Sequence, residues 1–261
     1  MSLWDALVLG VVQGATEFLP VSSSGHLVIA QAVLDVSIPG VVFEIAVHLA
    51  TLVSVLLVYR QRVSKLIVGT LHRDKESWRY LTLLVIATLP AAVIGILWGD
   101  QVEALFERPE VVGIALLVTG ALLWSTKSAL ARGPDGFPTV RIAILMGFAQ
   151  AFALVPGISR SGATVVAGLW LGLGAREAAA FSFLMAIPAI SGAAILKAPE
   201  MLAMGAGVST GALAVAGLAA GLTGVLAIRS FVSLLEKQSF HRFAGYCWAV
   251  GLAFLAFLSW G

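Results

Sequence analysis

The chain is poor in charge and in cysteine. Only 11% of its 261 residues are Asp, Glu, Lys or Arg, whereas 59% are hydrophobic. The single Cys247 excludes an internal disulfide, and we expect it to be a small packing residue, with a reactive thiol as the alternative. A chain this apolar does not fold as a water-soluble domain. The composition predicts a polytopic membrane protein.

Several common motifs are also missing. The sequence has no paired His/Cys spacing for zinc, no Walker loop, no Rossmann glycine set and no basic stripe for nucleic acid. Zinc chemistry, nucleotide hydrolysis and nucleic-acid binding therefore have no support. The first basic residue is Arg60, so the N-terminal apolar run has no positive flank and does not resemble a signal peptide. We expect that run to belong to the mature fold.

Apolar stretches of helix length, separated by polar or Gly/Pro-containing connectors, divide the chain. They cover about 3–18, 24–34, 41–59, 80–98, 111–126, 139–155, 161–173, 178–196, 208–228 and 244–260. A membrane span needs roughly 20 apolar residues. The short pairs 3–18 with 24–34 and 139–155 with 161–173 are therefore predicted to be two re-entrant helix hairpins. The remaining segments predict six spanning helices in an all-α fold.

One polar pattern occurs twice in the chain, with corresponding residues 136 or 137 positions apart. Its members are Gly10, Gln13, Pro20, Ser22, Ser24 and Gly25 in the first copy and Gly147, Gln150, Pro156, Ser159, Ser161 and Gly162 in the second. At membrane depth, non-helical backbone is tolerated only where protein buries it or where it lines a wet cavity. Two such interruptions in corresponding halves indicate one polar site between them.

The basic residues are unevenly distributed among the connectors. One group of connectors holds 13 Lys/Arg and the other holds 2. The basic group is 60–79, 125–141, 173–178 and 229–243, and the other group is 99–110 and 197–207. We interpret the run 60–79 as a cytoplasmic topology signal, with lipid-headgroup recognition as the alternative. This orientation opens the two hairpins to opposite sides. It predicts a single membrane domain, 1–261, with repeat 1 at about 1–126 and inverted repeat 2 at about 137–261.

Arg160 is the one basic residue placed away from the predicted connectors. An ionisable side chain at membrane depth marks a functional site by default. Ser159 or Ser161 can cap the helix that starts here, and a guanidinium beside hydroxyls at a helix N-terminus suits phosphate oxygens. The alternative is that Ser and Gly only cap a broken helix. The candidate phosphate-binding residues are Ser22, Ser159, Arg160, Ser161 and Thr164.

The first hairpin carries complementary chemistry. Gln13 and Glu17 share a helix face, and Ser23 and His26 follow at the break. A carboxylate in an apolar helix is costly unless paired or hydrated, so Glu17 is predicted to accept a proton, bind a divalent cation or neutralise Arg160. His26 is a proton shuttle or a hydrogen-bonded structural group. The candidate catalytic residues are Glu17, Ser23, His26 and Arg160, and the candidate metal ligands are Gln13 and Glu17.

Two other patterns are interpreted as structural. Glu44 and His48 lie four residues apart on an apolar span, and we expect them to make interhelical hydrogen bonds, with a supporting role beside the site as the alternative. Gly217 and Gly221 have the spacing typical of close helix packing in membranes.

The two polar segments resemble the signature segments of a known family. GVVQGATEFLPVSSSGH (10–26) and PGISRSGAT (156–164) are similar to those of the undecaprenyl-diphosphate phosphatases, also called bacitracin-resistance proteins. The resemblance continues through LATL (49–52), TLPA (88–91) and FSFL (181–184), so it covers nearly the whole chain. It implies a bacterial inner-membrane enzyme that hydrolyses undecaprenyl diphosphate to the monophosphate and recycles the lipid carrier for peptidoglycan and other wall polymers.

The resemblance also implies a divalent cation, Mg²⁺ or Ca²⁺, and a site open to the periplasm. The partners expected are a polyprenyl diphosphate substrate and membrane lipids, with no nucleic acid; a homo-oligomer is left open. Relatives carry Glu or Gln at the place of Gln13, and often Arg at the place of Cys247. In the mechanism we expect, Ser23 or a water activated by Glu17 attacks the terminal phosphoryl group. Because inverted repeats with broken helices also build transporters, a carrier or flippase of a phosphorylated polyprenyl lipid is the alternative function.

Overall fold

The computed structural model describes residues 1–36, 42–129, 136–204 and 208–260. Within these ranges the chain forms twelve α-helices and one 3₁₀ helix, η2. They are α1 Leu3–Phe18, α2 Ser23–Leu34, α3 Val42–Val58, α4 Arg60–Leu71, α5 Lys75–Leu97, α6 Gly99–Phe106, α7 Pro109–Ala129, α8 Val140–Phe152, α9 Arg160–Trp170, α10 Ala175–Met204, α11 Thr210–Glu236, η2 Phe240–Arg242 and α12 Phe243–Trp260. The predicted all-α fold is confirmed. Parts of the predicted segments and connectors, at 41, 130–135, 205–207 and 261, lie outside the described residues.

Long apolar helices make up most of the fold. Five stretches within the described ranges are long and apolar enough to cross a membrane, namely α5, α7, most of α10, α11 and η2 with α12. Helices α3 and α4, which meet at an angle of 80°, make a sixth candidate if they are one bent span. The prediction of six spans is thus met by five or six candidates. The short segments predicted as hairpins form the short helices α1, α2, α8 and α9.

The connectors predicted at 60–79 and 99–110 are not loops throughout, because they contain α4 and α6. Both helices mix charged with apolar residues, so their average hydropathy is too low to predict an apolar helix from the sequence. Neither helix buries any of its side chains. The third difference is at 197–207, where α10 continues to Met204 although Pro188 and Pro199 lie within it. Several basic residues assigned to connectors, such as Arg62, therefore lie on helices.

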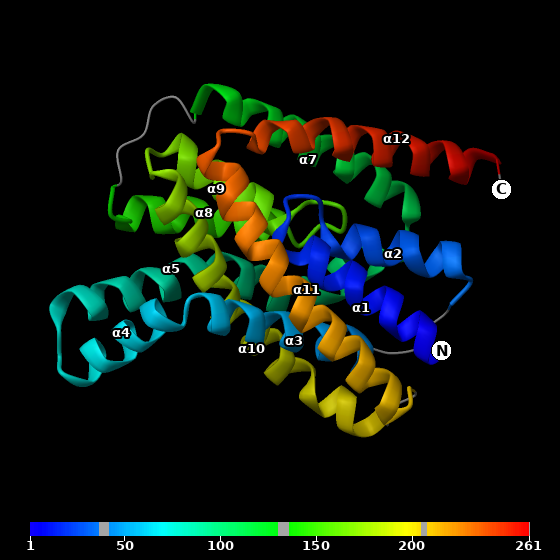
Figure 1. Ribbon diagram of the computed structural model, residues 1–261, viewed down its shortest axis with the longest axis horizontal. Helices are drawn as coiled ribbons and strands as arrows, with labels where there is room; N and C mark the ends of the chain where they lie inside the picture. Colours follow the sequence, from blue (N-terminus) through cyan, green and yellow to red (C-terminus); the bar gives the residue numbers. More distant parts are fainter. Residues whose placement is uncertain (37–41, 130–135, 205–207, 261) are drawn as a thin grey trace.

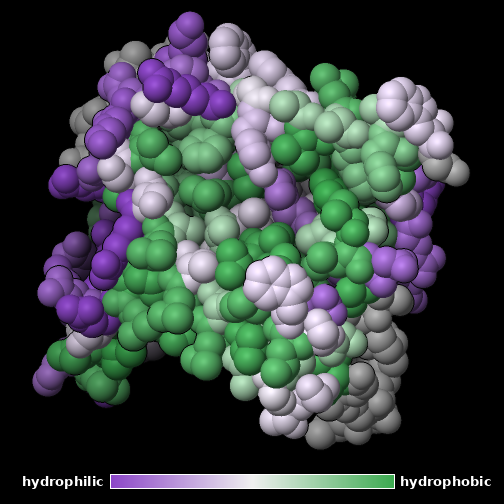
Figure 2. All heavy atoms as spheres, turned by 45° about the vertical axis from the view of Figure 1, so that its right-hand side comes forward, coloured by the Kyte–Doolittle hydropathy of each residue, from purple (hydrophilic) through white to green (hydrophobic). Residues whose placement is uncertain are grey.

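The exterior of the molecule is strongly apolar. Figure 2 shows a broad hydrophobic surface across the middle of the molecule, with hydrophilic residues gathered mainly along its two sides. On α11, the side chains of Leu218, Leu222 and Leu226 are all exposed at a spacing of one helical turn. A soluble protein rarely exposes a contiguous surface of this kind. This surface is suited to contact with lipid tails.

Small residues let the short helices approach the long ones closely. Helix α1 packs along α11, and α8 packs along α5 (Figure 1). A Cβ atom built on Gly10 would lie 2.4 Å from the carbonyl oxygen of Ala216, and one on Gly147 would lie 2.7 Å from that of Ala87. By contrast, a Cβ on Gly217 would have its nearest neighbour at 3.7 Å, an ordinary contact. The closest approach to α11 therefore depends on the glycines of α1, not on the predicted Gly217.

Replacing Gly10 by Ala should destabilise the protein by about 1–3 kcal/mol, because the added methyl group must push α1 away from the backbone of α11. Gly217→Ala is the matched control, since its methyl group fits the space present. Thermal unfolding of the purified protein in detergent measures both. Equal midpoints for Gly10→Ala and the wild type would contradict this account of the packing.

Candidate functional site

Each of the two polar segments breaks the chain between two short helices and starts the second helix with a serine cap. The Ser22 side chain accepts a hydrogen bond from the Gly25 N–H at 3.4 Å at the start of α2, and that of Ser159 accepts from the Gly162 N–H at 3.1 Å at the start of α9. We call residues 19–22 the first tip and residues 153–159 the second tip. The repeated sequence pattern therefore produces a serine-capped helix start twice, although the backbone differs, with φ 68° at Ser22 and φ −73° at Ser159.

The second tip is held by α7. The Thr119 hydroxyl donates to the carbonyl oxygen of Gly157 at 2.9 Å and accepts from the N–H of Ser159 at 3.1 Å. Gly157 has φ +96°, and a Cβ on it would lie 2.5 Å from the carbonyl oxygen of Val112. Only glycine meets both conditions. The first turn of α9 also contacts the first tip, because the Ser161 hydroxyl donates to the carbonyl oxygen of Leu19 at 3.2 Å.

A salt bridge joins the two halves of the chain beside these tips. Arg160 Nη2 donates to Glu17 Oε1 at 2.7 Å, and the two side chains are only 17% and 6% exposed. Arg160 Nη1 donates to the carbonyl oxygen of Ser182 at 3.3 Å. The two charged residues singled out in the sequence are thus partners in the folded protein. A buried pair of this kind holds both charges in place without bulk water.

The second carboxylate oxygen of Glu17 is also engaged. The Ser23 hydroxyl donates to Glu17 Oε2 at 2.6 Å, and Gln13 Nε2 donates to it at 3.1 Å. His48 Nε2 lies 3.5 Å from the same oxygen. A hydroxyl in a short hydrogen bond to a carboxylate is the arrangement in which the carboxylate can take its proton. This geometry suits Ser23 as a candidate nucleophile and Glu17 as its candidate base.

Glu17, Ser23, His48 and Arg160 line a cavity of about 660 Å³, whereas Gln13 is buried behind them and does not line it. Its polar lining consists of Glu17, Ser22, Ser23, Ser24, His48, Thr88, Gln150, Ser159, Arg160 and Lys197. Its apolar lining comes largely from α5, α6 and α10 and includes Ala91, Val102, Phe106 and Ile190. A cavity with charged and hydroxyl groups beside apolar walls suits an amphiphile whose headgroup is an anion.

Besides the fully buried Gln13, three of the predicted site residues do not line this cavity. His26 Nδ1–H donates to the carbonyl oxygen of Ser22 at 2.8 Å, and its Nε2, which then lacks a hydrogen, accepts from the Tyr246 hydroxyl at 2.9 Å. The Thr164 hydroxyl is 2.7 Å from the Arg160 carbonyl oxygen and 2.6 Å from the Ser182 hydroxyl. Ser161 bonds the first tip. All three hold the tips and the start of α9.

The structure adds residues that sequence reasoning ranked low. His48 was expected to make interhelical hydrogen bonds, but its Nδ1–H donates within its own helix, α3, to the Glu44 carbonyl oxygen at 2.7 Å. Its other ring nitrogen faces Glu17, a contact between helices that spacing along one helix does not reveal. Ser182 lies within segment 181–184, which is part of the family resemblance, but nothing in its residue type or spacing indicated a place at the site. Gln150 belongs to the repeated pattern, which was the available signal for it.

Cys247 lies beside the first tip. It is buried, and its Sγ is 3.6 Å from the carbonyl oxygen of Pro20. The adjacent Tyr246 stacks on His26 with ring centroids 5.7 Å apart. Helix α12 thus supports the first tip much as α7 supports the second. The expectation that Cys247 is a small packing residue agrees with its burial here.

A divalent cation has oxygen donors here but no complete protein cage. In the described part of the chain, no three His, Cys, Asp or Glu residues cluster closely enough to hold a metal. Gln13 Oε1, however, is buried without a hydrogen-bond partner, and its amide is bonded to Glu17. Carboxylate and amide oxygens are hard ligands of the kind that Mg²⁺ and Ca²⁺ take. The set fits a cation whose remaining ligands come from a phosphorylated substrate.

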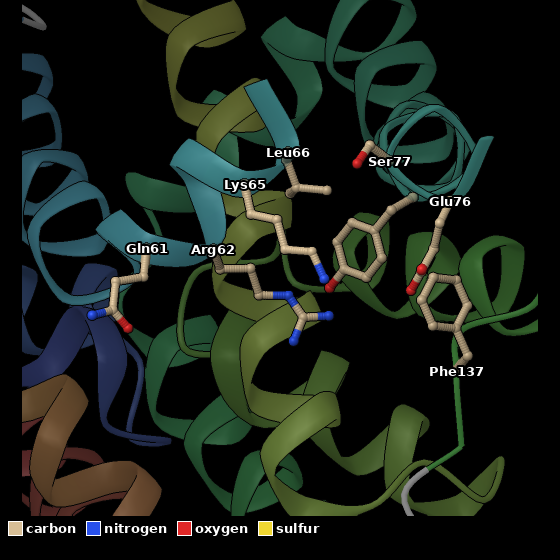
Figure 3. Close-up of a pocket in the computed structure, with 8 residues that line it drawn as sticks. Gln61, Arg62, Lys65, Leu66, Glu76, Ser77 and Phe137 are labelled. Atoms are coloured by element: carbon tan, nitrogen blue, oxygen red, sulfur yellow. The ribbon is translucent and has the colours of Figure 1, made fainter. Parts of the chain in front are cut away.

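A second cavity, of about 400 Å³, lies between α4, α5 and Phe137 (Figure 3). Arg62 and Lys65 reach into it from α4. Arg62 is paired with Glu177 at 2.8 Å, and the Tyr80 hydroxyl donates to the same carboxylate at 3.0 Å. The charge of Arg62 is thus compensated within the protein. This network joins α4 and α5 to the start of α10.

Comparisons with known proteins agree along the whole chain. Residues 6–253 match the family model described as bacitracin resistance protein BacA. A protein of Desulforapulum autotrophicum named undecaprenyl-diphosphatase is 41% identical, with 97% of each chain covered. Another of that name, from Christiangramia forsetii, is 41% identical over 98% of each chain. Undecaprenyl-diphosphatase 1 of Bacillus licheniformis is 38% identical over 96% of each chain.

Proposed function

This chain belongs to the bacitracin resistance protein BacA family, and from that premise we propose how its larger cavity hydrolyses undecaprenyl diphosphate. The chain is a multi-pass membrane enzyme, an undecaprenyl-diphosphatase. The products are undecaprenyl phosphate and inorganic phosphate, so the reaction returns the lipid carrier to cell-wall synthesis. This is the activity that the sequence resemblance predicted.

The salt bridge between Glu17 and Arg160 inside the cavity is the observation that carries the mechanism. The diphosphate lies against the polar lining, and the polyprenyl chain lies along the apolar lining from α5, α6 and α10. Arg160 has five N–H donors, of which Glu17 and a carbonyl oxygen use two. The remaining donors bind the terminal phosphoryl group, together with the hydroxyls of Ser22 and Ser159.

Ser23 is the nucleophile that we propose. Its hydroxyl oxygen attacks the terminal phosphorus as Glu17 takes the proton, the bridging P–O bond breaks, and Glu17 passes the proton to the departing undecaprenyl phosphate. A water activated by Glu17 then hydrolyses the phosphoserine, which releases inorganic phosphate and restores the Ser23 hydroxyl. Direct attack by that water on the substrate uses the same residues without the covalent step. Trapping of a phosphoserine in rapidly quenched turnover separates the two routes.

His26, Ser161 and Thr164 act by positioning in this mechanism. His26 fixes the carbonyl oxygen of Ser22, next to the nucleophile, and so sets the turn that presents Ser23 to Glu17. Thr164 holds the backbone of Arg160 at the start of α9. Their replacement should lower the rate through misplacement of Ser23 and Arg160.

A divalent cation, Mg²⁺ or Ca²⁺, belongs in this proposal with Glu17 and Gln13 as its protein ligands. When bound, the cation neutralises charge on the diphosphate and on the phosphoryl group in transfer. The unpartnered Gln13 Oε1 supports this placement.

Removal of divalent cations should abolish turnover. The positive charge of Arg160 is already paired with the Glu17 carboxylate, so without a cation the charge of the diphosphate is not neutralised. Activity should be lost after EDTA treatment and return when Mg²⁺ or Ca²⁺ is added. Gln13→Ala should raise the cation concentration needed for half-maximal activity, with Gln238→Ala, on an exposed turn, as the matched control. Full activity in the presence of excess chelator would remove the cation from the mechanism.

The inverted repeat remains part of the proposal. Helix pairing supports it, because α1 packs on α11 as α8 packs on α5, and α3 packs on α11 as α10 packs on α5. In this scheme repeat 1 covers about 1–126 and repeat 2 about 137–261. The charge distribution in the sequence supports a cavity that opens to the periplasm.

Phosphate release by the purified protein tests the function. In detergent there is no flux across a membrane, so a carrier or flippase of the lipid has no signal in this assay. We expect undecaprenyl diphosphate to yield inorganic phosphate and undecaprenyl phosphate in equal amounts. A well-folded preparation that binds the lipid but releases no phosphate would favour the transport alternative.

A further inference from the structure

Gln150 has a buried amide group without a hydrogen-bond partner. Its side chain is 3% exposed, and neither Nε2 nor Oε1 has a partner within the described residues. Buried polar side chains are nearly always hydrogen-bonded, so an exception calls for an explanation. Gln150 also lines the cavity that contains Glu17 and Arg160. Its amide is therefore available next to the proposed substrate.

The repeated pattern explains why this amide is free. Gln13 and Gln150 both stand nine residues before the serine that caps the following helix. Four residues after Gln13 is Glu17, which accepts a hydrogen bond from the Gln13 amide at 3.1 Å. Four residues after Gln150 is Leu154, which has no acceptor. The second copy of the pattern keeps the glutamine but lacks the carboxylate that would accept a hydrogen bond from its amide group.

The neighbours of Gln150 indicate which part of a lipid diphosphate it meets. After Gln150 the chain leaves α8, and the second tip adds Ala153, Leu154 and Ile158 to the lining before Ser159 and Arg160. Along this part of the chain the lining thus has a boundary between apolar and polar side chains. The phosphate next to the polyprenyl chain would lie at such a boundary, whereas the terminal phosphate lies with Arg160.

We propose that Gln150 binds the lipid-side phosphate of the substrate, with Nε2–H donating to a non-bridging oxygen. The inference rests on the proposed function and adds to it a binding residue that distinguishes the two phosphates. Because neither amide atom is committed to a protein partner, turning the side chain into the cavity breaks no hydrogen bond. A neutral amide also adds a donor without adding charge beside Arg160.

Gln150→Met separates this role from packing. Methionine has nearly the same length and is apolar, so it removes the unsatisfied amide and should keep or raise the thermal midpoint of the ligand-free protein. Binding should change in the opposite direction. We expect about a tenfold weaker affinity for a non-hydrolysable polyprenyl methylenediphosphonate and for undecaprenyl phosphate as a product inhibitor. Inhibition by inorganic phosphate, which occupies the terminal site, should be unchanged.

Two other variants complete the test. Gln150→Glu keeps the shape and adds a negative charge, so it should weaken analogue binding more than Gln150→Met does. If Gln150→Met does not fold, the binding measurements on Gln150→Glu still test the proposal. Gln238→Met, on an exposed turn, should leave all three affinities unchanged.

The outcomes distinguish this inference from the proposed function. If the wild type releases phosphate while both Gln150 variants bind the analogue normally, Gln150 is not a binding residue and the function stands. If inorganic phosphate inhibition weakens together with lipid phosphate inhibition, the assignment to the lipid-side phosphate is overturned. A folded wild type that neither releases phosphate nor binds the analogue overturns the proposed function, and this inference with it.

Discussion

Arg160→Ala lowers kcat/KM for undecaprenyl diphosphate by about 10²–10³-fold, the loss typical of one transition-state donor. Phosphoryl transfer depends mainly on positioning and charge neutralisation, and among the described residues Arg160 supplies the only guanidinium in the lining of the larger cavity. The variant also leaves Glu17 without the partner that lies 2.7 Å from it. Steady-state phosphate release in detergent measures the effect.

Two further variants sharpen the result for Arg160. Arg160→Lys keeps the charge but loses the planar fork of donors, so it should retain only part of the activity. Arg108→Ala removes an arginine that is paired with Glu110 at the surface and lies outside the cavity lining, so it should behave as the wild type does. Near-normal turnover by Arg160→Ala would show that another group neutralises the transferred phosphoryl.

Glu17→Gln lowers kcat by about 10²–10⁴-fold, the usual contribution of a positioned base. Glutamine keeps the shape of Glu17 but cannot take the proton of the Ser23 hydroxyl, which lies 2.6 Å from the carboxylate. Measured in the presence of a chelator, so that no divalent cation contributes, the affinity for a methylenediphosphonate analogue should be kept or improved, because a negative charge has been removed from an anion site. The combination of a lost kcat with retained binding is the signature of a base.

Glu177→Gln is the matched control for Glu17→Gln. The Glu177→Gln variant also removes a carboxylate that pairs with an arginine, Arg62. Arg62 lines the other, smaller cavity. We expect a lower thermal midpoint and a kcat close to that of the wild type. If both variants lose kcat to the same degree, the effect of Glu17→Gln comes from an unpaired arginine and not from base catalysis.

The sequence was sufficient to predict the helical fold and to single out Glu17 and Arg160. Both are ionisable residues at interruptions of apolar segments, where burial without a partner is expensive, so their pairing has a direct physical cause. The serine caps were equally readable, because an N-cap is decided by residues within one turn. Long apolar helices such as α5 and α11 follow from composition alone.

Other features depend on contacts between distant segments and were not predictable. His26 and His48 are both single histidines near polar segments, and only the packing of α12 and α3 decides which imidazole faces Glu17. Helices α4 and α6 were predicted as connectors because amphipathic, charged helices have low mean hydropathy. The hydroxyl of Thr164 was predicted to bind phosphate, but it bonds Arg160 and Ser182 after folding.

The separation of Glu17 from Arg160 along the chain has a consequence for biogenesis. The two residues are 143 positions apart, so at a synthesis rate of about 5–20 residues per second the acidic side chain leaves the ribosome roughly 7–30 s before its partner. A lone charge in the bilayer centre is unfavourable. We therefore expect α1 and α2 to stay in a hydrated place, at the translocon or the lipid interface, until the C-terminal half supplies Arg160.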